Sequence, residues 1–137
     1  EEVLVEKFID GKLLAIGMNG EQAMPIVHIR PKSGFYDYEA KYTSGKTDYI
    51  CPADLSPMET QRCQDIAAKV YQALRGSGMP RVDVILDSEG TPHVLEMNTI
   101  PGMTSTSLLP MAAKESGMEF EDLVIEILKS AQLDYSE

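Results

Sequence analysis

The sequence is poor in cysteine, with only Cys51 and Cys63 among its 137 residues. It contains no Cys-x-x-Cys pair and no histidine at ligand spacing from either cysteine. A disulfide framework and a cysteine zinc site are therefore both excluded. We expect two free thiols, buried or half-buried, in a protein of a reducing compartment.

Basic residues are also scarce, since 12 Lys and Arg stand against 22 Asp and Glu and leave a net charge of -10. Nucleic acids and anionic membranes are bound through clustered positive charge, so we expect neither as a partner. No apolar run approaches the roughly 20 residues of a membrane span, and no signal-peptide pattern opens the chain. These absences predict a cytoplasmic protein and leave small molecules as the open class of ligand.

What is present suffices for one domain with a sizeable core, because 43% of the residues are hydrophobic. Strand-like runs cover residues 3–9, 13–18 and 24–29, and the dipeptides Asp10-Gly11 and Asn19-Gly20 separate them. Such dipeptides favour tight turns, so a small antiparallel meander is predicted. The chain starts with Glu and enters a strand pattern almost at once, which favours a piece of a longer protein.

A stretch without sustained apolar periodicity follows at residues 30–48. It contains four aromatic residues, which disfavour disorder, so we expect a functional loop. A helix is predicted next, because Ser56 can cap it, Pro57 suits its first position and Glu59 completes a capping box. Two strands and two further helical segments complete an α+β fold, predicted as a mostly antiparallel sheet with helices packed on one face.

The two later strands carry polar residues at alternate positions. Because side chains alternate across a strand, Arg81 and Asp83 share one face of the first strand, as Glu96 and Asn98 do in the second. A turn of two or four residues then places Asp83 opposite Glu96 and Arg81 opposite Asn98. The residues expected to face the core are Val82, Val84, Leu86, His93, Leu95 and Met97.

Two carboxylates that face each other across a strand pair repel, so a cation is expected between Asp83 and Glu96. With Asn98 they offer hard oxygen ligands, which suit a magnesium ion that keeps some waters and shares substrate phosphates. Arg81 beside them would hold an anionic oxygen. The alternative, which the residues leave open, is a solvated polar face whose carboxylates pair with Arg or Lys.

A Pro-Gly step and a run of hydroxyl residues follow the second strand. Gly102 permits close approach of its backbone to a ligand, and Ser105, Thr106 and Ser107 precede a helix that begins near Leu108. The N-terminus of a helix offers free N–H groups that suit a carboxylate. The alternative here is ordinary Ser or Thr capping.

Three motifs occur in one order: DYEAKY at 37–42, PRVDVILD at 80–87 and EMNTIPGMTSTSL at 96–108. In this combination the chain resembles the C-terminal part of the D-alanine:D-alanine ligase family of ATP-grasp enzymes, over nearly its whole length. The resemblance implies an ATP-grasp C-terminal subdomain. It also implies that residues 1–137 are a fragment that lacks the N-terminal substrate domain and the central lid, and that is inactive alone.

In this family, ATP phosphorylates the carboxylate of one D-alanine, and the amine of a second D-alanine attacks the acyl phosphate to form the dipeptide used in peptidoglycan. By resemblance, Asp83, Glu96 and Asn98 hold two magnesium ions on the ATP phosphates, with manganese as an alternative ion. Glu96 takes the bridging position between the two ions.

The resemblance also assigns roles in the second step. Arg81 and the backbone N–H of Gly102 stabilise the tetrahedral oxyanion. Ser107 and Leu108 receive the carboxylate of the second D-alanine, and Tyr42 closes over the substrates.

The remaining assignments concern the nucleotide. Lys41 contacts the phosphates, and a hinge strand contacts adenine, partly through its backbone. The hinge positions are Glu6, Lys7, Phe8 and Ile9. The full-length protein is expected to be a homodimer whose partners are ATP, D-alanine and the missing N-terminal half.

One departure from the family pattern stands at Leu13, where the family usually places a glutamate near the nucleotide. An apolar side chain cannot make that polar contact. Two alternatives stay open: a ligase that joins D-alanine to D-lactate or D-serine, and, because of Leu13, a non-catalytic nucleotide- or metal-binding domain. Tyr42 resembles the residue of dipeptide-forming members.

Overall fold

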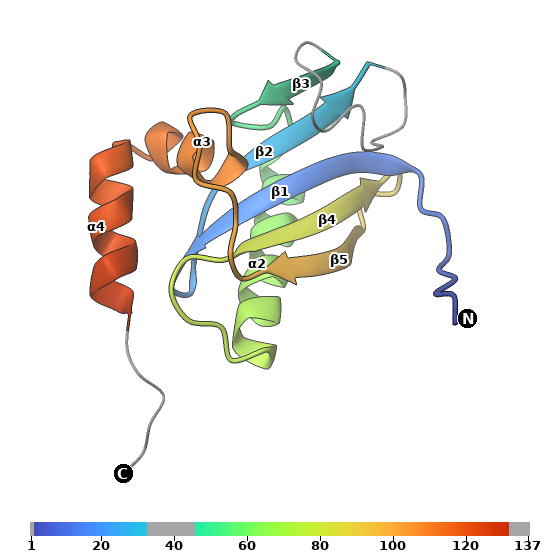
Figure 1. The fold of residues 1–137 in the computed structure, drawn as a ribbon. Helices are drawn as coiled ribbons and strands as arrows, with labels where there is room; N and C mark the ends of the chain where they lie inside the picture. Colours follow the sequence, from blue (N-terminus) through green and yellow to red (C-terminus); the bar gives the residue numbers. More distant parts are fainter. Residues whose placement is uncertain (1, 33–45, 132–137) are drawn as a thin grey trace.

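The structure, a computed structural model, describes residues 2–32 and 46–131. Its elements are β1 (Gly11–Asn19), β2 (Gln22–Pro31), β3 (Thr47–Ile50), α2 (Pro57–Ala73), β4 (Arg81–Asp87), β5 (Pro92–Asn98), α3 (Leu108–Glu115) and α4 (Phe120–Ser130). The strands form one sheet in the order β3-β2-β1-β4-β5, and each neighbouring pair is antiparallel (Figure 1). The predicted α+β class with an antiparallel sheet is confirmed.

β1 and β2 form a tight hairpin near the predicted turn. Asn19 pairs with Gln22, so Gly20 and Glu21 make the connection. Gly20 has a φ of 56°, in the left-handed region that glycine enters without a steric penalty. The turn predicted from Asn19-Gly20 is therefore confirmed.

The strand predicted at residues 3–9 is wrong for this structure. The segment runs away from the sheet ahead of β1 (Figure 1), and Val3 and Phe8 expose 82% and 74% of their surfaces. A strand requires a neighbour for its N–H and C=O groups. Alternation of side chains is a property of the segment alone, but a strand forms only where another strand can pair with it. No described strand lies beside this segment.

β3 was missed, because the long loop was expected to extend to Asp48. Its four residues pair with the end of β2, and Arg30 stands opposite Asp48. An exposed ion pair reinforces this register, with 3.2 Å between Arg30 Nη2 and Asp48 Oδ2. The rest of the predicted loop, residues 33–45, lies outside the described residues and contains Lys41 and Tyr42.

α2 begins as its sequence predicts. Ser56 Oγ accepts a hydrogen bond of 3.3 Å from the Glu59 N–H, and the Glu59 carboxylate accepts one of 2.8 Å from the Ser56 N–H. Pro57 occupies the first helical position. The reciprocal bonds satisfy two amides that the first turn would otherwise leave without partners.

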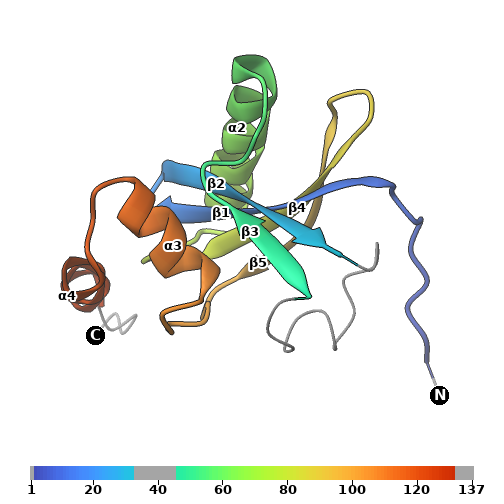
Figure 2. The ribbon, with the colours of Figure 1, turned by 90° about the horizontal axis from the view of Figure 1, so that it is seen from above.

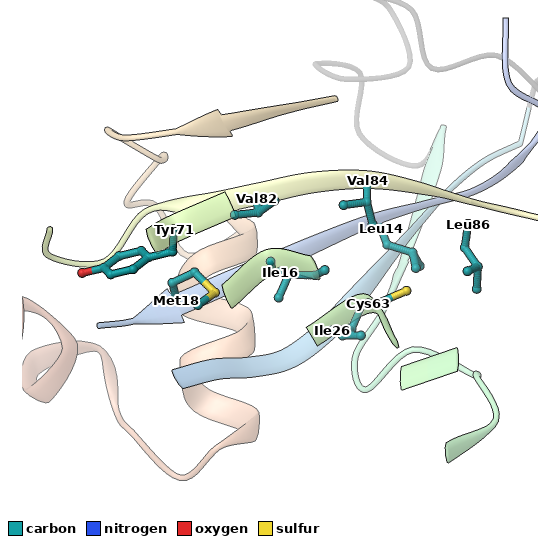
Figure 3. Packing of buried hydrophobic residues seen from close by; sticks show 10 residues of the cluster. Leu14, Ile16, Met18, Ile26, Cys63, Tyr71, Val82, Val84 and Leu86 are labelled. Carbon is teal, nitrogen blue, oxygen red and sulfur yellow. The ribbon is translucent and has the colours of Figure 1, made fainter. Parts of the chain in front are cut away.

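The sheet separates two apolar cores, because successive β1 side chains point to opposite faces. The α2-face core consists of Leu14, Ile16, Met18, Ile26, Cys63, Ala67, Tyr71, Val82, Val84 and Leu86 (Figure 3). The α3-face core consists of Ala15, Met24, Val27, Ile29, Met79, Leu108, Leu109, Ala112, Ala113 and Leu123.

The expectation that the helices pack on one face is therefore wrong. α2 covers one face of the sheet, and α3 covers the opposite face with α4 beside it (Figure 2). The central strand β1 is buried from Leu14 to Met18 on consecutive positions, which is typical of a strand that is covered on both sides. That run was the available sequence signal for two layers of helices.

The cysteines are free, as predicted. Cys63 is buried in the α2-face core, Cys51 is half-buried, and burial raises the pKa of each thiol to about 11. Both are therefore protonated near neutral pH and poor nucleophiles. Among the residues that the structure describes, no helix has the length and apolar character needed to cross a membrane.

The capping box gives a stability prediction. Ser56→Ala removes the hydroxyl that accepts from Glu59 N, so we expect the free energy of unfolding to fall by about 1 kcal/mol. Urea denaturation measures the change. Ser88→Ala, in the exposed turn between β4 and β5, is the matched control and should change stability little. Equal losses in the two variants would contradict a stabilising role for the cap.

Candidate functional site

The candidate site lies on the hairpin of β4 and β5, at one edge of the sheet (Figure 1). Asp83 stands opposite Glu96, and Arg81 stands opposite Asn98. The predicted register of these four residues is confirmed. Directly opposed residues of an antiparallel pair project to the same face, so all four share the face that α3 partly covers.

A β-bulge changes the register between Asp83 and Val84. Val84 pairs with Val94 while Asp83 pairs with Glu96, so Leu95 is the additional residue of β5. Beyond the bulge, His93 stands opposite Ile85 and therefore shares the face of Asp83. The expectation that His93 and Leu95 face the core is wrong, and Leu95 is 52% exposed.

The bulge decides on which face the polar residues of β5 lie. If the pairing of Val84 with Val94 continued without a break, Glu96 would stand opposite Val82, whose side chain lies in the α2-face core. The additional residue turns Glu96 and Asn98 to the face of Asp83 instead. Met97 consequently packs against the α2-face core, as the sequence predicted.

Arg81 and Asp83 form a two-pronged ion pair. Arg81 Nε lies 2.7 Å from Asp83 Oδ1, and Arg81 Nη2 lies 2.7 Å from Asp83 Oδ2. Asp83 is only 8% exposed and is the one buried charged residue of the described chain. The sequence left open a solvated polar face whose carboxylates pair with Arg or Lys. Asp83 does pair with an arginine, but it is buried and not solvated.

The oxygen donors of the site come from Asp83, Glu96 and Asn98, which share one face of the hairpin. Glu96 is exposed, while Asn98 Oδ1 accepts a hydrogen bond of 3.1 Å from Ile100 N–H. Within residues 2–32 and 46–131, no group of three His, Cys, Asp or Glu residues could hold a metal by itself. Two carboxylates and one amide oxygen nevertheless fit magnesium, because that ion completes its shell with water and phosphate oxygens. The residues present therefore fit magnesium as a shared ion, without forming a closed cage.

The loop after β5 brings Gly102 against Ser107. A Cβ at Gly102 would lie 2.9 Å from Ser107 Oγ, so only glycine fits without a shift. Ser107 Oγ accepts a hydrogen bond of 3.0 Å from Thr104 N–H and lies 2.8 Å from Thr104 Oγ1. Thr104, which the sequence analysis did not single out, therefore fixes the Ser107 hydroxyl.

α3 starts at Leu108, as predicted, with Ser107 at the N-cap position. The Ser107 side chain makes no capping bond to the helix, since it is engaged by Thr104. The alternative of ordinary capping is therefore wrong for Ser107. Pro110 has no N–H, so the first-turn amides that the helix can offer an anion are those of Leu108 and Leu109.

The expected adenine-contacting residues 6–9 lie in the segment that leads into β1. Gly11 pairs with Asp87 and Gly17 pairs with Arg81. The segment therefore enters the sheet at the end of β4 remote from Arg81. Leu13 is half-buried and packs against the α3-face core.

Known proteins share both the sequence and the fold. The family described as "D-ala D-ala ligase C-terminus" matches residues 1–129. The chain belongs to this family. The resemblance drawn from the three sequence motifs is thereby confirmed.

D-alanine–D-alanine ligases resemble the chain closely in sequence. The protein of Methylacidiphilum infernorum is 50% identical over 96% of this chain and 43% of its own length. That of Pseudoalteromonas translucida is 45% identical over 93% of this chain and 42% of its own length. The chain thus spans about two fifths of these relatives.

Solved structures of ligases with the ATP-grasp fold agree. The D-alanine–D-alanine ligase of Bacillus anthracis complexed with ATP superposes with a TM-score of 0.77 at 34% identity, over 91% of this chain and 41% of that one. The VanG D-Ala:D-Ser ligase of Enterococcus faecalis superposes with a TM-score of 0.74 at 30% identity, over 90% of this chain and 37% of that one.

A second polar cluster secures the tip of the hairpin that carries the D-Ala–D-Ala ligase motif. Asp87 Oδ2 lies 2.7 Å from His93 Nε2, and Asp87 Oδ1 accepts bonds of 2.9 Å from the Glu89 and Thr91 N–H groups. The His93 hydrogen bond, followed by that from Thr91, lowers the pKa of Asp87 from its usual 3.8. The bulge places His93 on the face where it meets Asp87.

This cluster predicts a pH-dependent contribution to stability. A carboxyl group whose pKa is lowered by folding stabilises the fold above its unfolded pKa of 3.8, and the contribution disappears as pH falls through the folded value. We therefore expect Asp87→Asn to unfold at lower urea than the wild type at neutral pH, with the difference shrinking below that pKa. Glu89→Gln, in the same turn, is the charge-matched control. A difference that persists in acid would exclude linkage through Asp87.

Proposed function

We propose that the chain is the C-terminal portion of the catalytic domain of an ATP-dependent ligase that joins two D-alanines for peptidoglycan synthesis. Membership of the family over residues 1–129 supports the proposal, as does 45–50% identity to D-alanine–D-alanine ligases. Because the chain corresponds to about two fifths of those proteins, the whole activity requires residues beyond it.

The register of the β4–β5 hairpin carries the proposal. It gathers Arg81, Asp83, Glu96 and Asn98 on one face, and the Gly102 loop continues directly from this strand into α3. One short stretch thus joins the oxygen donors to the N–H groups of a helix. Phosphoryl transfer to a carboxylate needs such a combination, since the protein contributes mainly position and charge.

Asp83, Glu96 and Asn98 would hold two divalent cations, magnesium or manganese. Magnesium, when bound, would neutralise phosphate oxygens and polarise the transferred group. Glu96 suits the bridging position because it is exposed and stands directly opposite Asp83. Lys41 would contact the same phosphates, and Glu6, Lys7, Phe8 and Ile9 would contact adenine.

In the second step, the amine nitrogen of one D-alanine would attack the carbonyl carbon of the acyl phosphate and form the C–N bond. The nitrogen would lose a proton to water, and the tetrahedral intermediate would then expel phosphate. Arg81 and the Gly102 N–H would stabilise the negative charge that develops on the oxygen of the attacked carbonyl group. Ser107 and the Leu108 N–H would bind the carboxylate of the attacking D-alanine, favoured by the positive end of α3. Tyr42 would close over both substrates.

The proposal also covers the compartment, the oligomeric state and the partners of the protein. The protein would act in the cytoplasm, where ATP is available, and as a homodimer in its full-length form. Its partners would be ATP, D-alanine and the N-terminal half of the same enzyme.

A D-alanine:D-serine ligase is the second candidate, because VanG is 30% identical to the chain. The first candidate is favoured by the higher identity, 45–50%, to D-alanine–D-alanine ligases, and Tyr42, which resembles the residue of dipeptide-forming members, disfavours D-lactate. Turnover of the full-length protein with D-alanine, D-serine and D-lactate as second substrates separates these activities. A non-catalytic domain, suggested by Leu13, would bind Mg·ATP in calorimetry without turnover in the same assay.

The bridging role of Glu96 is tested in the full-length protein. Glu96→Gln keeps the size of the side chain but removes its charge, so we expect ligation to fall on the order of 100-fold or more. Glu89→Gln removes the same charge from the hairpin tip and should leave the rate nearly unchanged. Wild-type turnover by Glu96→Gln at saturating magnesium would contradict the metal assignment.

The chain of 137 residues by itself should fold and yet form no D-alanyl-D-alanine. Orientation of two reactants contributes about 7–11 kcal/mol to a barrier, and the proposal places the first-substrate domain and further phosphate lysines outside the chain. Dipeptide formation is assayed with ATP, magnesium and D-alanine, before and after addition of a separately expressed N-terminal half. Clear dipeptide formation without that half would contradict the fragment proposal.

A further inference from the structure

We infer that Arg81 competes with a divalent cation for Asp83, so that cation binding weakens this ion pair and releases the guanidinium toward the substrate. The inference rests on the proposed function, because it assigns Asp83 to a cation and Arg81 to an anionic oxygen. It adds a coupling between the two roles: Arg81 becomes available for an oxyanion when the cation binds.

A cation that bound to Asp83 would perturb its ion pair with Arg81, because Arg81 contacts both carboxylate oxygens. Both oxygens of Asp83 accept bonds of 2.7 Å from Arg81. A carboxylate has about four lone-pair positions, of which the guanidinium takes two. A dication on the remaining positions would lie close to the guanidinium, and the two positive charges would repel each other.

Burial makes this repulsion large. The side chains of Arg81 and Asp83 are only 11% and 12% exposed. Water therefore screens charges at this pair much less than at exposed pairs such as Arg30 with Asp48. A positive charge brought to Asp83 must lower the affinity of that carboxylate for Arg81, and by thermodynamic reciprocity Arg81 must lower its affinity for the cation.

The same burial explains why the pair exists. A carboxylate buried to this degree is costly without a counter-charge, and Glu96 across the strand adds a second negative charge. Arg81 satisfies Asp83 in the absence of a cation. When a cation takes over that task, Arg81 still stands opposite Asn98, the last residue of β5, after which the chain continues to Gly102.

Binding of Mn²⁺ to the chain is the direct test, with relaxation of water protons as the readout and no turnover required. Arg81→Gln removes the competing charge and should bind Mn²⁺ about tenfold more tightly than the wild type, the value of a charge-assisted hydrogen bond. Arg30→Gln, which changes the net charge equally at an exposed pair, controls for general electrostatics and should match the wild type.

Thermal unfolding gives a second readout. Without metal, Arg81→Gln should melt below the wild type because Asp83 loses its counter-charge, and Mn²⁺ should restore more of its midpoint than it adds to the wild type. If Arg81→Gln fails to fold, Arg81→Lys carries the test, because lysine keeps a charge but not the two-pronged contact.

The outcomes separate the inference from the proposed function. Binding by Arg81→Gln that equals or falls below that of the wild type, while Glu96→Gln abolishes it, would overturn the competition and leave the metal site standing. Absence of Mn²⁺ binding in every variant at millimolar metal, with ATP present as well as without it, would overturn the competition and the metal assignment together. Equal tightening in Arg81→Gln and Arg30→Gln would assign the effect to net charge and overturn it as well.

Discussion

The pairing of the edge strand β5 with β4 is the constraint on which the candidate site depends. A single additional residue at Leu95 shifts this pairing, and because side chains alternate along a strand, the shift exchanges the faces of all following residues. Glu96 and Asn98 thereby join Asp83 and Arg81, while Met97 joins the α2-face core. The bulge reconciles an apolar core with a polar site on neighbouring positions of one strand.

The two faces of the sheet differ in what covers them. The first is filled by the α2-face core, which extends across β1, β2 and β4. The second is shared: α3 packs mainly on β1 and β2, and the polar residues of β4 and β5 occupy the remaining edge. Burial of the chain is therefore deepest where the strands lie between helices. The site forms where one of these covers ends, with Asp83 held by its ion pair at that boundary.

Local features of the fold were predictable because their causes lie within a few residues. The capping box of Ser56 and Glu59 and the turn at Gly20 each follow from adjacent side chains and backbone preferences. The strand expected at residues 3–9 failed for the opposite reason, since a strand needs a partner that its own sequence does not specify. β3 was missed because its four residues are ordered mainly by pairing with β2.

The sequence by itself determined the family and the chemistry of the donors, because motif spacing and residue types are properties of the chain. Only the tertiary structure decided the placement of helices on both faces, the bulge at Leu95 and the bonding of Asp83 to Arg81. Each of these depends on competition between groups distant in sequence. The competition concerns which face of the sheet buries more apolar surface, which strand register satisfies both cores, and which positively charged group pairs with a buried carboxylate. Such competition is settled by packing and desolvation, which no single segment of the chain encodes.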